Sequence, residues 1–263
     1  MTRFTAESGL ALSYRDSGPA DGPVLVLAHG LGMDLRIWDP VVPLMPEGLR
    51  IVRYDMRGHG GSDTLAPPYK MGALVRDAEA LLDHLAVRDC VFLGLAMGGM
   101  VAQGLAVKRM DMIRALILSN TTSKSGPPKA WHERADAALS GGMEAVVEPV
   151  LARWFSKAFL TSEAADPWRD MLLSQNPRGY AGGCAAIAGT DFYTPTSGLR
   201  LPCLGLAGSE DRAIPPDLVR ETVDLIPGSQ FELLRRAGHL PCVDQPEAFA
   251  RAVSRFLHEI GHL

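Results

Sequence analysis

The sequence predicts an α/β fold with a mostly parallel central sheet, helices on both faces and one helical insertion. Two patterns support this fold class. Short apolar runs of buried-strand length alternate with longer segments whose apolar residues recur at helical spacing. One such run, residues 91–95, leads through a glycine-hinged turn straight into a helical segment. With 263 residues and 47% hydrophobic content, the chain can build one large core of this kind.

The first part of the chain supplies most of the predicted sheet. A helix between the third and fourth strands is indicated by an apolar stripe at Leu74, Ala78, Leu81, Leu82 and Leu85. A second helix is expected over residues 98–108. The predicted strands of this part are residues 10–15, 24–28, 51–54, 91–95 and 113–118.

Between Thr121 and about Leu201 the alternation stops, and we expect an inserted helical cap. Its short helical pieces are predicted to be interrupted at Gly141-Gly142, Pro167, Pro177 and Gly182-Gly183. The domain division is therefore a core of residues 1–120 and 202–263 with a cap of residues 121–201.

After the cap the alternation resumes with a strand over 203–207, a helix over 216–225 and a strand over 231–234. A final helix is expected to start at Asp244, with this residue as its N-cap and Glu247 completing a capping box.

Charge and cysteine use narrow the function classes. The net charge of -4 and the absence of a Lys/Arg run argue against nucleic-acid and anionic-membrane partners, which leaves a small-molecule ligand. The four cysteines show no C-x-x-C spacing and suit reduced thiols. No leader and no membrane span are evident, so we expect a cytoplasmic protein. We also expect no metal and no cofactor, and the oligomeric state stays open.

The turn at residues 94–98 matches the nucleophile elbow, G-x-S-x-G, in which a strained strand-to-helix turn exposes the central residue. Gly94 and Gly98 fit because strand and helix backbones approach too closely there for a Cβ. The apex, however, is Ala96, whose side chain has no nucleophilic atom.

An aspartate and a histidine much later in the chain complete the order nucleophile, acid, histidine that a catalytic triad of this kind follows. Asp211 and His239 each follow a predicted strand, and parallel sheets gather catalytic groups at the carboxyl ends of their strands. His239 would act as the general base, and Asp211 would hold its other ring nitrogen. Glu210 is the rival acid.

An oxyanion hole is expected from the backbone N–H groups of Leu31 and Met97, one after a buried strand and one after the apex. Because these are backbone donors, the hole does not depend on the side chain at position 96. The nearby His29 and His59 are interpreted as loop-structuring residues.

These motifs together resemble the α/β-hydrolase family and, within it, the 3-oxoadipate enol-lactonases of the β-ketoadipate pathway. The resemblance runs from about Leu10 to Leu257. It rests on Leu31-Gly32-Met33-Asp34 with Trp38, on residues 53–60 and 94–100, on cap stretches 119–121, 152–155 and 179–187, and on Gly238-His239 with residues 245–249. The family has serine where this chain has Ala96.

The resemblance implies hydrolysis of a lactone through a Ser-Asp-His triad. Two explanations compete for Ala96: a serine-to-alanine change made to trap a substrate, or a natural non-hydrolytic relative. The intact Asp211, His239 and elbow glycines favour the first. Other functions left open are another lactonase, a carboxylesterase, a carbon–carbon bond hydrolase, and a non-catalytic binding protein of the same fold.

An enol-lactone of 3-oxoadipate carries a free carboxylate, which requires a cationic partner in an apolar pocket. Trp131 and Arg134 stand at i and i+3 on one predicted helix, so they would share a face. We expect Arg134 to bind the carboxylate. Arg153, beside Trp154, is the second candidate. The alternative for the tryptophans is packing within the cap, and the alternative for the arginines is exposure to solvent.

Overall fold

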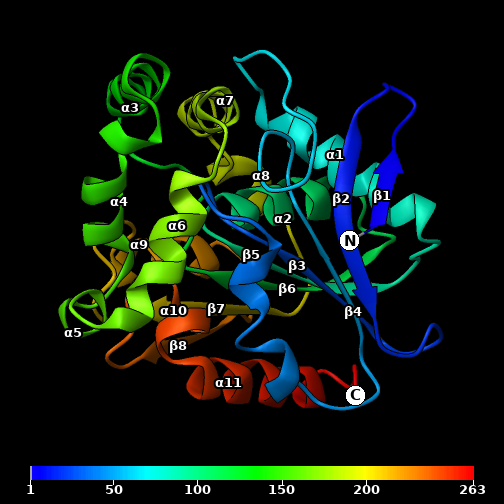
Figure 1. The fold of residues 1–263 in the computed structure, drawn as a ribbon. Helices are drawn as coiled ribbons and strands as arrows, with labels where there is room; N and C mark the ends of the chain where they lie inside the picture. Colours follow the sequence, from blue (N-terminus) through cyan, green and yellow to red (C-terminus); the bar gives the residue numbers. More distant parts are fainter. Residues whose placement is uncertain (1) are drawn as a thin grey trace.

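The computed structural model describes residues 2–263, so Met1 lies outside it. One eight-stranded sheet runs through the molecule in the order β1-β2-β4-β3-β5-β6-β7-β8 (Figure 1). The pairs from β4 to β8 are parallel, whereas β1 and β2 form an antiparallel extension at one edge. The strands are β1 (Thr2–Thr5), β2 (Ala11–Ser17), β3 (Val24–Ala28), β4 (Arg50–Tyr54), β5 (Cys90–Leu95), β6 (Ile113–Ser119), β7 (Cys203–Gly208) and β8 (Gln230–Leu234).

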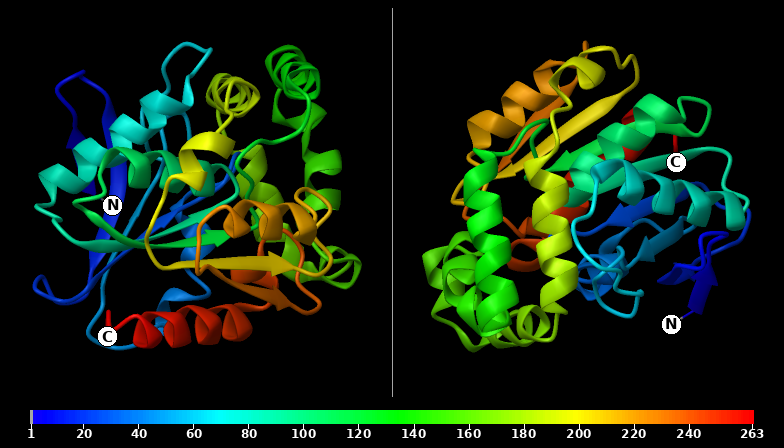
Figure 2. Two further views of the ribbon diagram at one scale, coloured as in Figure 1. Left: turned by 180° about the vertical axis from the view of Figure 1, so that it is seen from behind. Right: turned by 90° about the horizontal axis from the view of Figure 1, so that it is seen from above.

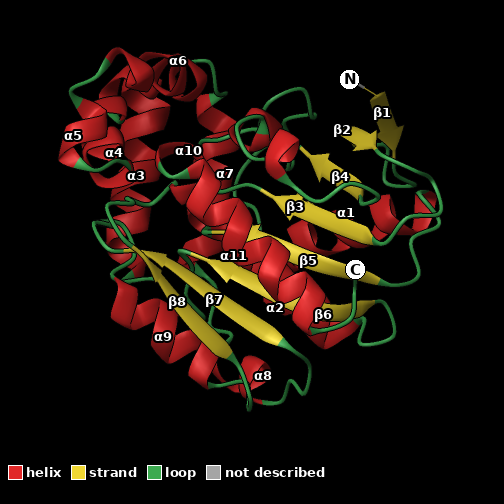
Figure 3. Cartoon of the chain, turned by 90° about the horizontal axis from the view of Figure 1, so that it is seen from below, coloured by secondary structure: helices red, strands yellow, loops and turns green. Residues whose placement is uncertain are grey.

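Helices cover both faces of the sheet, as the sequence predicts. Helix α11 (Pro246–Glu259) crosses one face, while α1 (Met71–His84) and α2 (Met97–Lys108) pack together on the other (Figure 3). Helix α9 (Pro216–Asp224) packs against β6, β7 and β8. The buried strands β3, β5 and β7 have no exposed residue, because both of their faces are covered.

The segment between β6 and β7 is helical, and its helices from α3 to α7 gather beyond the carboxyl ends of the strands (Figures 1 and 2), whereas α8 packs against α2. Helices α3 and α7 lie side by side there. The elements are α3 (Pro128–Gly141), α4 (Val147–Trp154), α5 (Lys157–Leu160), α6 (Asp166–Leu173), α7 (Pro177–Ala188) and α8 (Tyr193–Ser197), with short 3-10 turns Met143–Ala145 and Glu163–Ala165. The division into core and cap at residues 121 and 201 remains a prediction.

Two details differ from the sequence predictions. The sequence does not predict strand β1, because its four residues are exposed or only half-buried and carry no apolar run. Gly182 and Gly183 do not interrupt a helix but lie inside α7. A Cβ on Gly182 would lie 2.5 Å from the Tyr69 ring, so the glycine lets the helix approach that ring closely.

The predicted capping box of the last helix is wrong. Helix α11 begins at Pro246 with Gln245 as its N-cap, and Asp244 instead ends the short helix α10 (Pro241–Asp244). A proline disfavours helical backbone in the residue before it, which moves the start beyond Asp244. The Asp244 carboxylate instead accepts a hydrogen bond from the Gly238 N–H at 2.8 Å.

None of the helices in the described part of the chain combines the length and apolar composition that a membrane span requires. The four cysteines are free and buried. Among residues 2–263, no group of three or more His, Cys, Asp or Glu side chains is arranged to hold a metal ion.

Candidate active site

Ala96 occupies the apex of a strained turn between β5 and α2, as the glycine spacing predicts. Its backbone lies at φ 51° and ψ -114°, a conformation that costs energy for any residue with a Cβ. A Cβ on Gly94 would collide with the carbonyl of Gly98, and a Cβ on Gly98 would collide with the carbonyl of Ala28. The elbow glycines are therefore required by close backbone packing.

Asp211 and His239 form a buried pair beside this turn. The Nδ1 of His239 lies 2.8 Å from Oδ2 of Asp211, and both side chains are almost inaccessible to solvent. Because an ionised carboxylate can only accept, Nδ1 carries the proton and Nε2 is the nitrogen left for chemistry. His239 and Ala96 line the same cavity.

The Asp211 carboxylate is fixed by donors on both oxygens. Oδ1 accepts from the backbone N–H groups of Ala213 and Ile214 at 2.7 and 3.0 Å. Oδ2 accepts from Asn120 Nδ2 at 2.8 Å in addition to His239. These donors hold the carboxylate in one orientation. The rival acid Glu210 is exposed, and the structure brings Asp211 rather than Glu210 to His239.

The other two histidines of this region hold loops, as expected. The ring of His29 accepts from the Met56 N–H at 2.9 Å, and that of His59 accepts from the Gly32 N–H at 3.1 Å. Burial lowers the pKa of His29 and lowers that of His59 to about 3. Both rings are therefore neutral and committed to backbone contacts.

The two backbone groups predicted for an oxyanion hole lie at this site. Leu31 and Met97 both line the cavity, and within residues 2–263 neither N–H has a hydrogen-bond acceptor. The loop that carries Leu31 passes close to the turn, since a Cβ on Gly30 would lie 3.1 Å from the Cβ of Ala96. Two free donors near the apex suit a developing negative charge.

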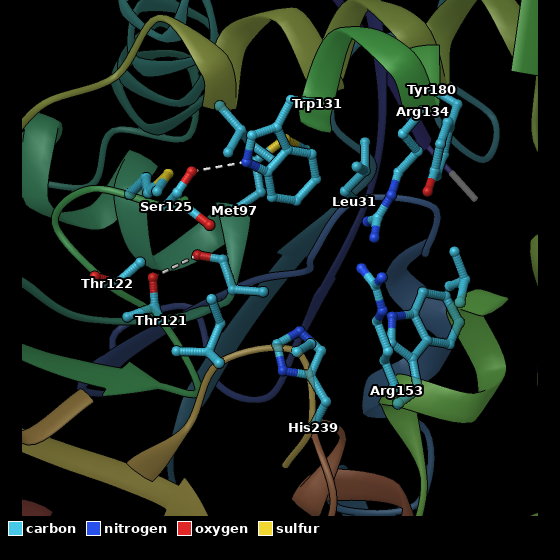
Figure 4. A pocket seen from close by; sticks show the side chains of 17 residues that line it. Leu31, Met97, Thr121, Thr122, Ser125, Trp131, Arg134, Arg153, Tyr180 and His239 are labelled. Carbon is cyan, nitrogen blue, oxygen red and sulfur yellow. Dashed lines mark hydrogen bonds between the residues drawn. The ribbon is translucent and has the colours of Figure 1, made fainter. Parts of the chain in front are cut away.

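The cavity lies between the strand ends and the helices of the predicted cap (Figure 4). It encloses about 610 Å³, including its opening to solvent. The four predicted substrate-binding residues all line it. Its lining comprises Leu31, Ala96, Met97, Met100, Thr121, Thr122, Ser125, Trp131, Arg134, Val150, Arg153, Trp154, Tyr180, Ile187, Ala213, Ile214 and His239.

Trp131 and Arg134 share one face of α3, as their spacing predicts. The guanidinium of Arg134 lies 4.7 Å from the centre of the Trp131 ring, and Trp131 Nε1 donates to the Ser125 carbonyl at 2.7 Å. Arg153, on α4, extends toward Arg134 from the opposite side of the cavity (Figure 4). Within the described residues, neither arginine forms an ion pair with a carboxylate.

Sequence reasoning gave no function to two residues that the structure places at the site. Asn120 follows β6 with φ 47° and contacts Asp211, while the buried Tyr180 lines the cavity from α7. Asn120 carried a usable signal, since it is a polar residue directly after a predicted strand. Tyr180 carries no such signal in the sequence, because it lies within a helix and only the packing of that helix brings it to the cavity.

Comparisons with known proteins agree with this geometry. The sequence model described as the alpha/beta hydrolase family matches residues 25–252. The 3-oxoadipate enol-lactonase 2 of Acinetobacter baylyi is 32% identical over 246 residues, which cover 93% of this chain and 92% of that protein. The chain therefore belongs to the α/β-hydrolase family.

Two solved structures resemble the whole chain. An enol-lactonase from Burkholderia xenovorans superposes with a TM-score of 0.94 at 33% identity, covering 98% of this chain and 100% of its own. A hydrolase from Pseudomonas aeruginosa gives a TM-score of 0.94 at 35% identity and 97% coverage of both chains.

Proposed function

We propose that this site hydrolyses carboxylic esters, specifically a lactone that carries a carboxylate, when a serine stands at position 96. The observation that carries the proposal is the His239–Asp211 pair, which lines one cavity with the apex of the nucleophile elbow. The similarity to enol-lactonases supports the lactone as substrate. A position in the β-ketoadipate pathway stays a prediction.

In the serine form, His239 Nε2 removes the hydroxyl proton as the oxygen attacks the lactone carbonyl. The carbonyl oxygen gains negative charge, which the N–H groups of Leu31 and Met97 stabilise. Asp211 stabilises the imidazolium that forms. The ring ester bond then breaks, and the enol oxygen leaves with the proton from His239. Water, deprotonated by His239, finally hydrolyses the acyl-serine and releases the open acid.

With Ala96 the chain has the binding cavity, the base and the oxyanion donors, but it cannot form the acyl intermediate. We propose that Ala96 replaces a serine. Sequencing the source gene tests this, because a native alanine codon would favour the second candidate, a non-catalytic binding protein. The specific observation behind that alternative is Ala96 itself.

The test of the proposed function is Ala96→Ser. Removal of a triad nucleophile costs on the order of 10⁶ in turnover in a protease example, so the serine form is expected to gain several orders of magnitude. The assay is disappearance of an enol-lactone at matched enzyme concentrations, with simple esters and a carbon–carbon cleavage substrate in parallel. No gain in a variant whose circular dichroism is unchanged would contradict the proposal, and a gain on simple esters alone would favour a carboxylesterase.

The carboxylate of the substrate is assigned to Arg134. Its guanidinium lies over Trp131 and lines the cavity without a protein carboxylate to neutralise it. A ligand carboxylate would form the ion pair that Arg134 lacks. The same pair would keep the ligand's own charge from being buried without a partner when it moves from water into the cavity.

A further inference from the structure

We propose that Arg153 couples recognition of the ligand carboxylate to the placement of His239, through the C-terminal end of α4. The inference rests on the proposed function for the kind of ligand, a carboxylate. It adds a route by which a residue in the helical segment acts on the base. Arg153 is thus proposed as a positioning residue for His239 as well as a ligand contact.

The first observation is a direct contact between α4 and the loop that carries His239. The His239 N–H donates to the carbonyl of Trp154, the last residue of α4, at 2.6 Å. A Cβ on Gly238 would collide with that carbonyl and would lie 2.9 Å from backbone atoms of Phe155 and Ser156. The backbone of residues 154–156 therefore lies directly on Gly238.

The same loop is held on its other side by core residues. Asp244 accepts from the Gly238 N–H at 2.8 Å, and Asn120 Nδ2 donates to the Gly238 carbonyl at 3.3 Å. The Gly238 peptide is thus fixed by the core, whereas the His239 N–H is paired with α4. Movement of the α4 end would release the half of the loop that bears the imidazole.

The second observation is the charge at that helix end. Arg153 is exposed, directly precedes Trp154 and lines the cavity, where it and Arg134 extend toward each other near His239 (Figure 4). Two guanidiniums that share a cavity without a counter-ion repel each other. A carboxylate between them removes this repulsion. Because the ligand then binds best when Arg153 is in place, it favours the arrangement in which α4 contacts the His239 loop.

Arg134 provides a matched contrast within the same cavity. It carries the same charge, but it projects from α3, which packs along α7, and its guanidinium is already held over Trp131. Among the described residues, no hydrogen bond joins α3 to the His239 loop. Loss of Arg134 should therefore weaken binding alone, whereas loss of Arg153 should also release His239.

The two variants should differ in kinetics of the serine form. Loss of a contact that orients catalytic residues lowers kcat, because that contact stabilises the transition state more than the bound substrate. Loss of a contact that stabilises both equally raises KM and leaves kcat unchanged. With an acidic lactone, Arg153→Ala should lower kcat about tenfold or more, while Arg134→Ala should raise KM and leave kcat within about threefold. Arg251→Ala, on the exposed side of α11, is the control for loss of a surface charge.

A binding experiment on the Ala96 chain tests the coupling without catalysis. The probe is monomethyl adipate, which carries one carboxylate and one ester, with dimethyl adipate as its neutral counterpart. Affinity is measured by calorimetry, and exchange of the His239 Nδ1 proton with water is measured by NMR of protein labelled with ¹⁵N-histidine. Saturating monomethyl adipate should slow this exchange about tenfold or more in the parent chain and, at a weaker Kd, in Arg134→Ala. In Arg153→Ala the slowing should be absent at saturation.

The proposal would be overturned if the ligand slowed this exchange in saturated Arg153→Ala. It would also be overturned if the slowing were lost equally in both arginine variants. Equal slowing by dimethyl adipate would also overturn it, because the carboxylate would then be irrelevant. If Arg153→Ala cannot be saturated, the kcat and KM comparison decides in the same way. Failure of Ala96→Ser to hydrolyse any lactone would reject the proposed function but would leave this binding result standing.

Discussion

The two walls of the cavity differ in how completely their polar groups are paired. On the core wall, the Asp211 carboxylate has four hydrogen-bond partners, one of which is the His239 ring. On the wall formed by α3 and α4, Arg134 and Arg153 face the cavity without a carboxylate partner in the described chain. In the proposed function, the core wall is organised in advance for chemistry, and the opposite wall is completed by the anionic ligand.

The largest expected effect tests the core wall at the base. In the Ala96→Ser background, His239→Ala should reduce turnover on the order of 10⁶-fold, because the nucleophile and base act as a unit. Substantial activity without the histidine would show that this wall is not the catalytic one.

A smaller but still large effect is expected at the acid. Asp211→Asn should lower kcat on the order of 10⁴-fold, because an amide cannot stabilise the imidazolium and favours the wrong tautomer. Glu210→Gln is the matched control one residue away and should remain within severalfold of the parent. The kinetic comparison uses the serine form. If Glu210→Gln were the more damaging change, the pairing seen in the structure would not be the functional one.

The open wall should respond selectively to the charge of the substrate. Arg134→Ala in the serine form should weaken kcat/KM for an acidic lactone by roughly 2 to 5 kcal/mol, the cost of leaving a charge unpaired. A neutral lactone or simple ester should be much less affected. Equal losses on acidic and neutral substrates would mean that Arg134 serves packing, and a selective loss at Arg153 alone would move the carboxylate to that residue.

The packing of the core wall can be tested through stability. Gly98→Ala places a methyl group against the Ala28 carbonyl and should lower the free energy of unfolding by about 1 to 3 kcal/mol or more. Gly72→Ala, in the first turn of α1, meets only the end of the Arg76 side chain at 3.8 Å and should be neutral or stabilising. Urea unfolding of the three proteins measures the difference. Equal stability of both variants would contradict the tight strand-to-helix turn.

A final test concerns the pH dependence of stability at one of the loops that frame the core wall. Burial keeps His59 neutral in the fold, with a pKa lowered to about 3, whereas the unfolded ring binds a proton near pH 6.5. Its contribution to stability is therefore complete above pH 6.5 and is lost as the pH falls toward 3. His59→Gln keeps a hydrogen-bond acceptor for the Gly32 N–H but removes the titrating ring, and with it this pH dependence of stability. The free energy of unfolding of the parent should thus fall more steeply on acidification, by up to about 1.4 kcal/mol per pH unit, and parallel curves would contradict the assignment.

Much of the molecule follows from local sequence. The apolar runs at 24–28 and 91–95 became fully buried strands, and the glycines at 94 and 98 marked the strained turn, because backbone sterics act over a few residues. The order of Ala96, Asp211 and His239 also followed from the chain, since strand ends of a parallel sheet share one edge. The predicted helical spacing placed Trp131 beneath Arg134 for the same local reason.

Other features depend on contacts between distant segments, and only the tertiary structure decided them. Asp244 looked like a helix cap, yet its carboxylate holds Gly238 because α10 ends beside the His239 loop. Asn120 reaches Asp211 across 91 positions of sequence. The contact between Trp154 and His239 likewise joins a helix and a loop that no periodicity relates. Periodicity and spacing determine which face or strand end a residue occupies, whereas the packing of one element against another determines which neighbour it meets.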